Sequence, residues 1–270
     1  VLPHLNHRIE EYKTRYKEQF PLGPPNLGSS NFYFLDETID WMVANILGNP
    51  TPYLCYFHLF PPHAPYKPDK NGFDRFKKDG FSRPSYPEHR FSQNISENEL
   101  SIESRRYDEF ILYFDDEFDR FIQALDANGV LDNSIVIFTS DHGEMLERGI
   151  KGHQTQTLFD SILHIPLMIS IPGQNTRLDI FENTTTVDLL PTLLNIAGAD
   201  IPVHLDGEIL PPFNKKFPDN RAIYSMVNSK EDQFTPLRRG TFSMITGKRK
   251  LVKYLGYSQL QPENELIELF

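Results

Sequence analysis

Apolar and polar residues alternate in blocks along the chain, and these blocks predict strands and helices in turn. Residues 135–138 form a β-branched apolar run that predicts a buried strand, and Ile165 to Ile171 predicts another. The aromatic run 53–60 predicts a third buried strand, which the prolines after it end. Strands that alternate with helices predict an α/β fold with a mostly parallel sheet covered by helices on both faces.

Helical spacing of apolar residues predicts helices over Asp36 to Leu47, over 101–129 and over Thr186 to Ala197. Asp36 is expected to be an N-cap or to lie in the first turn, and Gly129 is a candidate C-cap. Residues 1–20 have the pattern of a surface helix, and 67–100 that of a long loop. Eight apolar residues fall on one face of the longest helix: Tyr107, Phe110, Ile111, Phe114, Phe118, Phe121, Ile122 and Leu125.

From about residue 205 the pattern changes to short strands separated by turns. Such a pattern is typical of antiparallel hairpins, so a small C-terminal antiparallel sheet is expected. The sequence therefore predicts two regions, an α/β domain over 1–204 and a small-sheet subdomain over 205–270.

Groups that can bind metals and anions follow the predicted strands. Asp141 and His142 come directly after the strand 135–138, and His63 follows the aromatic run. Lys151 and His153 lie in the next loop. Because the ends of parallel strands meet at one edge of a sheet, we expect these groups to converge there. Carboxylate and imidazole bind metals, and cationic donors neutralise oxyanions, so the set suits an anionic ester.

Composition narrows the class of protein. The formal net charge of −10 and a pI near 5.4 argue against a nucleic-acid binder but leave anionic substrates open. A single cysteine, Cys55, excludes an internal disulfide and is interpreted as a core residue. No apolar stretch is long enough to span a bilayer, and no signal peptide opens the sequence, so the compartment stays unknown.

The chain contains the stretch 132-DNSIVIFTSDHGE-144, followed in order by 187-VDLLPTLLNIAGADIP-202 and 205-LDGEILP-211. In these stretches, and most specifically in the first, the chain resembles the sulfatase family of the alkaline phosphatase superfamily. The resemblance covers nearly the whole chain from Asp36 onward. It implies an alkaline-phosphatase-like α/β fold and hydrolysis of sulfate esters, with a small-molecule or glycan ester as the substrate.

The resemblance also implies roles for single residues. Asp141 and His142 match the pair that binds the active-site metal, usually calcium, and His63 matches a histidine that contacts the sulfate or the ester oxygen. Many sulfatases have a lysine where this chain has Thr155. His153 or Lys151 is expected to supply the missing donor as a catalytic residue, with His153 preferred.

Two features of the family are absent from the sequence. Its nucleophile lies in Cys/Ser-x-Pro-x-Arg, and an Asp-Asp metal pair lies near its N-terminus. We therefore expect a C-terminal portion of a longer enzyme that is inactive alone. A phosphoester hydrolase or phosphoglycerol-type transferase that uses Mg²⁺, Mn²⁺ or Zn²⁺ is the alternative, and a non-catalytic pseudo-enzyme is a second. His58 is interpreted as a packed or edge histidine.

Overall fold

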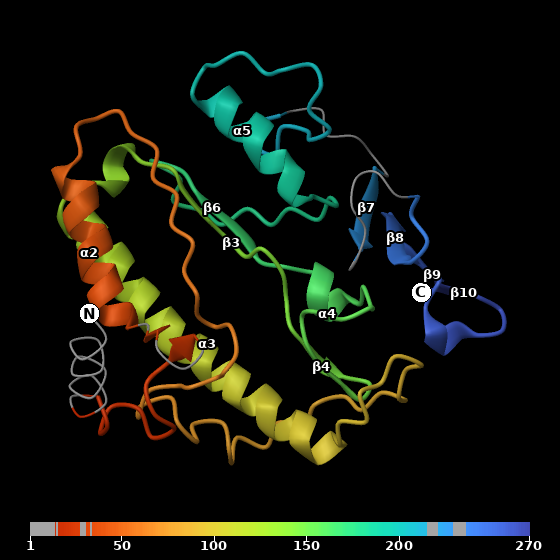
Figure 1. Cartoon of the computed structure of the whole chain (residues 1–270). Coiled ribbons are helices and arrows are strands. Elements are labelled where there is room, and N and C mark those ends of the chain that lie inside the picture. The colour runs from red at the N-terminus through yellow and green to blue at the C-terminus, as the bar shows by residue number, and fades with distance from the viewer. Residues whose placement is uncertain (1–13, 15, 28–30, 33, 215–220, 229–235) are drawn as a thin grey trace, which may run out of the picture.

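The computed structural model describes residues 14, 16–27, 31–32, 34–214, 221–228 and 236–270 (Figure 1). Most of the helix expected over 1–20 lies outside the described residues. A short antiparallel pair, β1 (Asn26–Leu27) and β2 (Asn31–Phe32), precedes the first long helix.

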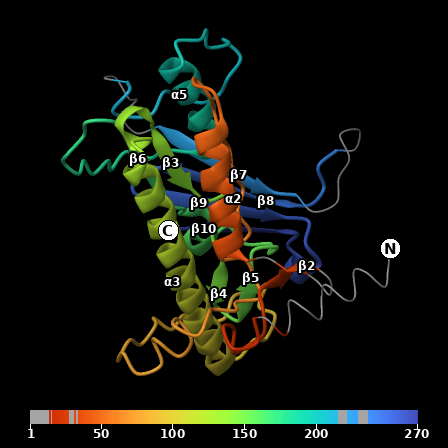
Figure 2. The same cartoon turned by 90° about the vertical axis from the view of Figure 1, so that its left-hand side faces the viewer.

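Two long helices cover one side of the structure. α2 (Leu35–Gly48) and α3 (Glu97–Ala127) run side by side (Figure 2). Ile39 and Met42 of α2 share a buried cluster with Phe121 and Leu125 of α3. Both helices match the expected positions. α3 begins four residues earlier than expected because Ser96 caps it, accepting a hydrogen bond from the Glu99 amide.

The central strands β3 (Val136–Thr139) and β6 (Leu167–Ser170) pair with Val136 opposite Ser170. Phe138 of β3 packs on Phe118 of α3, with ring centroids 4.9 Å apart, so α3 covers this pair. The chain passes from β3 to β6 through the hairpin of β4 (Met145–Glu147) and β5 (Ile150–Gly152) and through α4 (Asp160–Leu163).

The expected parallel pairing is not seen, because every strand pair that the structure describes is antiparallel. A parallel pair needs a crossover of a dozen or more residues, usually with a substantial helix. Between β3 and β6 the described helix, α4, has only four residues. The chain therefore enters β6 from the end at which it leaves β3.

The aromatic run 53–60 has no ladder pairing to described residues, although a strand was expected there. Its side chains still alternate as in a strand. Cys55, Phe57 and Leu59 pack partly buried against the α2–α3 cluster, which agrees with the core reading of the cysteine. Leu54 and Tyr56 are exposed.

After β6 the chain forms a 3₁₀ turn over Thr186–Asp188 and then α5 (Leu189–Ile196), close to the expected helix. A four-stranded antiparallel sheet follows, as expected, in the order β10-β9-β8-β7. Its strands are β7 (Ala222–Val227), β8 (Gly240–Thr246), β9 (Arg249–Leu255) and β10 (Glu265–Leu269). The domain boundary at 204 stays a prediction.

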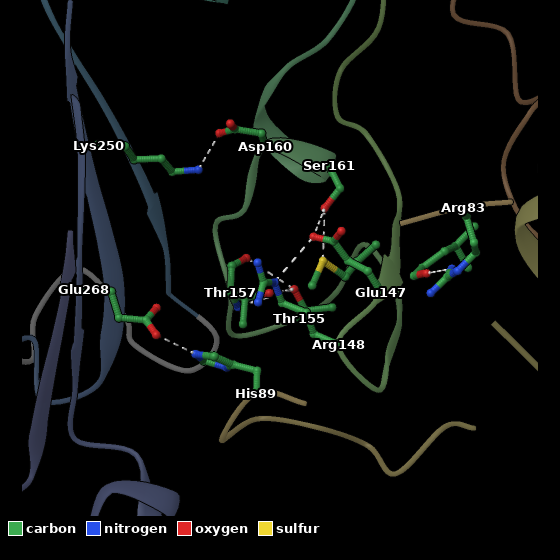
Figure 3. A network of polar contacts seen from close by, with 12 residues as sticks. Arg83, His89, Glu147, Arg148, Thr155, Thr157, Asp160, Ser161, Lys250 and Glu268 are labelled. Atoms are coloured by element: carbon green, nitrogen blue, oxygen red, sulfur yellow. Dashed lines mark hydrogen bonds and ion pairs between the residues drawn. The ribbon is translucent and has the colours of Figure 1, made fainter. Parts of the chain in front are cut away.

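Apolar and polar contacts join the C-terminal sheet to the central hairpin. Val252 and Tyr254 of β9 share a buried cluster with Met145 and Ile150. Figure 3 shows polar contacts from the same sheet to α4 and to the segment before α3. Lys250 Nζ lies 2.8 Å from Asp160 Oδ1, and His89 Nε2 lies 3.2 Å from Glu268 Oε1.

Candidate active site

The turn after β3 presents Asp141 and His142. The Asp141 Oδ1 atom accepts a hydrogen bond of 3.0 Å from the His142 amide. Gly143 follows and donates its amide hydrogen to the Ile162 carbonyl at 2.8 Å. A Cβ at Gly143 would lie 2.1 Å from the carbonyl oxygen of Ser161, so only glycine fits here. The close approach of α4 thus fixes the direction in which the Asp141-His142 turn points.

Three imidazole rings meet beside this turn. His153 stacks on His142 with centroids 4.2 Å apart, and it meets His63 edge-on at 4.8 Å. His63 comes from the Pro-rich segment after 53–60, and His153 follows β5. The structure therefore brings together four of the five residues singled out in the sequence, namely Asp141, His142, His63 and His153.

Backbone carbonyls orient two of the rings. His142 Nδ1 lies 2.8 Å from the Gly143 oxygen, and His63 Nδ1 lies 2.6 Å from the Ala64 oxygen. A carbonyl oxygen only accepts, so each hydrogen bond needs a proton on Nδ1. In the neutral ring, Nε2 then carries the lone pair and is available to a metal or a substrate.

Lys151 lies elsewhere. Its Nζ atom pairs with Glu103 Oε1 of α3 at 3.1 Å. Thr155, at the position where many sulfatases have lysine, is buried, and its hydroxyl lies 3.0 Å from that of Thr157. Of the candidate donors on this loop, only His153 reaches the imidazole cluster.

Of the two environments expected for His58, packed or at an edge, the structure excludes the packed one. Its side chain is 63% exposed, and its Nε2 atom lies 3.5 Å from Asp141 Oδ2. The same Oδ2 atom lies 3.7 Å from His142 Nε2. His58 is on the exposed side of the run that leads to His63, and this shared segment is the signal that could have identified it.

A buried carboxylate lies behind the imidazoles. Glu144 Oε2 is 3.6 Å from His153 Nδ1, and the Glu144 side chain is 4% exposed. Burial, and then the Glu144 charge, raises the pKa of Tyr107 to about 12. The same two causes raise the pKa of Tyr66, whose ring meets that of Tyr107 at 5.2 Å. Both phenols therefore keep their protons at neutral pH.

Two of the residues at this turn are of types that bind metals. Asp141 and His142 offer one carboxylate and one imidazole, whereas calcium takes about 6–8 oxygen ligands. Within the described ranges, no group of three or more His, Cys, Asp or Glu side chains is placed to hold an ion. These donors fit a metal site only as two of its ligands.

The chain is similar in sequence to known proteins. The family model described as Sulfatase matches residues 4–199. The chain is 29% identical over 181 residues to an ulvan-active sulfatase of Formosa agariphila, covering 64% of this chain and 33% of that protein. It is 27% identical over 173 residues to arylsulfatase K of Rattus norvegicus, covering 63% and 31%. The chain thus spans about a third of the length of these relatives.

Solved structures share the alkaline-phosphatase-like fold. The phosphonate monoester hydrolase of Agrobacterium radiobacter superposes with a TM-score of 0.70 and 19% identity, over 97% of this chain and 61% of that one. A structure in complex with its substrate D-glucosamine-2-N,6-O-disulfate gives 0.64 and 16%, over 89% and 63%. None of the helices in the described part of the chain is long and apolar enough to cross a membrane. The match of the Sulfatase model to most of the chain shows that the protein belongs to the sulfatase family.

Proposed function

We propose that the protein carrying this chain hydrolyses sulfate esters and needs a divalent metal ion to do so. The observation that carries the proposal is the group of three imidazoles packed beside the Asp141-His142 turn. A sulfate ester is anionic, and it develops further negative charge on its leaving oxygen as the S–O bond breaks. Nitrogen donors at fixed positions stabilise such charge.

Each residue has a distinct role in this proposal. Asp141 and His142 contribute ligands to the metal, with calcium the first candidate. A metal ion bound there would polarise the ester oxygens and help to ionise the attacking hydroxyl. His63 holds an oxygen of the sulfate or of the ester. His153 donates the proton to the leaving oxygen, because it contacts both other rings while Lys151 pairs with Glu103.

Hydrolysis of a phosphorus ester is the second candidate. The structural similarity to a phosphonate monoester hydrolase favours it, with a TM-score of 0.70. The substrate would then be a phosphate or phosphonate ester, with Mg²⁺, Mn²⁺ or Zn²⁺ as the metal.

The test is an assay of the full-length protein on aryl sulfates, aryl phosphates and phosphonate monoesters. Each substrate is tried with Ca²⁺, Mg²⁺, Mn²⁺ and Zn²⁺ after chelation. We expect the highest kcat/KM on a sulfate ester, and we expect His153→Ala to lower kcat by about 100-fold or more. Lys151→Ala is expected to change it much less. A severe loss in Lys151→Ala with little change in His153→Ala would reverse the assignment.

A further inference from the structure

A buried carboxylate contacts the proposed proton donor from outside the imidazole cluster. Glu144 follows Gly143 directly, and its side chain is 4% exposed. Its Oε1 atom and His153 Nδ1 are both buried, and neither has a hydrogen-bond partner among the described residues. Burying a carboxylate is costly unless a donor or a cation compensates it. The role of Glu144 therefore depends on which neighbouring group compensates its charge.

His153 is the sole ion-pair partner of Glu144 in the part of the chain that the structure describes. Lys151, the nearest lysine in sequence, pairs with Glu103 instead. Tyr66 and Tyr107 contribute phenols whose pKa is raised by burial and by the Glu144 charge. A protonated phenol can donate a hydrogen bond but carries no charge. The imidazole of His153 is thus the group through which Glu144 can influence the reaction.

The two neighbouring rings define the plane of the His153 ring. His142 covers one face of the ring at an interplanar angle of 22°, and His63 meets it at 62°. Nδ1 faces Glu144, 3.6 Å from Oε2. Because Nδ1 and Nε2 lie on different edges of an imidazole, Nε2 is turned away from the carboxylate.

We infer that Glu144 is a positioning residue: it holds His153 with Nδ1–H toward its carboxylate, so that Nε2 faces the substrate and, in the doubly protonated ring, carries the proton given to the leaving oxygen. The inference rests on the proposed function, since it assigns to Glu144 the control of the proton donor. An acidic group that fixes the tautomer and orientation of a histidine is a general device in active sites. In this chain the acidic group is Glu144, three residues after Asp141.

Glu144→Gln in the full-length protein tests the inference. A carboxylate can only accept from Nδ1–H, whereas an amide offers either a donor or an acceptor and no longer dictates the tautomer. We expect kcat to fall about 10- to 100-fold, as for other groups that orient a functional histidine. KM should change by less than about 2-fold if ground-state contacts to the substrate are kept.

A double variant separates positioning from an independent role. If Glu144 acts through His153, Glu144→Gln should cause no further loss in a His153→Ala background. Losses that multiply would show that Glu144 acts independently, and would overturn the inference. Glu103→Gln is the matched control, because it also removes a carboxylate that contacts the 151–153 region, but from Lys151. It should keep the wild-type kcat.

A measurement without turnover keeps this inference separate from the proposed function. ¹⁵N–¹H NMR of histidine side chains reports whether the proton of His153 is on Nδ1. We expect an Nδ1–H signal in the wild-type protein and its loss or redistribution in Glu144→Gln, with melting temperatures unchanged. If the protein hydrolyses no ester but shows this change, the proposed function fails and the positioning role stands. An identical His153 tautomer in both proteins would refute the positioning role.

Discussion

The geometry of the Asp141-His142 turn depends on the absence of a side chain at Gly143. Alanine there would bring its Cβ to 2.1 Å from the Ser161 carbonyl oxygen, which belongs to the backbone of α4 and cannot rotate away. We expect Gly143→Ala to lower the free energy of unfolding by about 1–3 kcal/mol, as for other overpacked sites. Chemical denaturation measures this loss, and the NMR signals of His142 and His153 report whether the turn has moved.

Gly48→Ala is the control for this substitution. A Cβ at Gly48, the last residue of α2, meets no atom within 4 Å. The same change should there be neutral or stabilising by up to about 1 kcal/mol, since alanine favours the helix. Equal stability of the two variants would show that the contact with Ser161 does not constrain the turn.

The sequence indicated which residues are candidates for the site, but it did not indicate which side chains contact one another. His63, Asp141 and His142 follow apolar runs, and that position together with the resemblance to sulfatases marked them as candidates. The pairing of Glu144 with His153 and that of Lys151 with Glu103 depend on how the β4–β5 hairpin folds back. No periodicity in the sequence specifies this path, so neither contact could be predicted.

The helices were predictable because each has an apolar face and end signals close to it. Gly129, which has a φ of 68°, correctly marked the end of α3, whereas the cap at Ser96 was missed and the start was placed four residues late. Strand direction was not predictable in the same way. An apolar run such as Ile165 to Ile171 indicates a strand, but only the path of the chain decides whether it pairs parallel or antiparallel.

The contact of the long loop with β10 should make stability depend on pH. Burial lowers the pKa of His89 below its ordinary 6.5, and Arg148 and Arg90 add to this, whereas Glu268 opposes it. Between the folded and unfolded pKa values the unfolded chain binds more protons. The stabilisation is therefore complete above about pH 6.5 and is lost as the pH falls toward the lowered folded-state pKa.

Melting temperatures of the wild type and His89→Gln between pH 7.5 and 5 test this expectation. The wild type should lose stability on acidification, and the variant should lose less. His164→Gln, which removes an exposed histidine just after α4, should keep the wild-type profile. Parallel profiles for wild type and His89→Gln would exclude His89 as the source of the pH dependence.

Across the chain, the order of helices and strands was predictable, but the side-chain contacts that connect them were not. The change of pattern near residue 205 correctly predicted an antiparallel sheet. Nothing in that pattern indicated which residues connect α5 to the segment before β7. Asp188 makes this connection, because it is fully buried at the start of α5 while its partners come from three separate segments.

Asp188 accepts hydrogen bonds from the amides of Thr185 and Glu208 at 2.9 and 2.8 Å. Both of its oxygens also accept from Arg221 Nη1 at 2.8 Å.

Asp188→Ala removes all these bonds at once, and breaking a buried charge pair costs about 3–5 kcal/mol. Asp179→Ala removes a carboxylate that pairs with Arg177 at 2.7 Å in an exposed position. It should cost at most about 1 kcal/mol. Urea denaturation of both variants measures the difference, and a loss in Asp188→Ala no greater than that in Asp179→Ala would show that the joint contributes little to holding the two regions together.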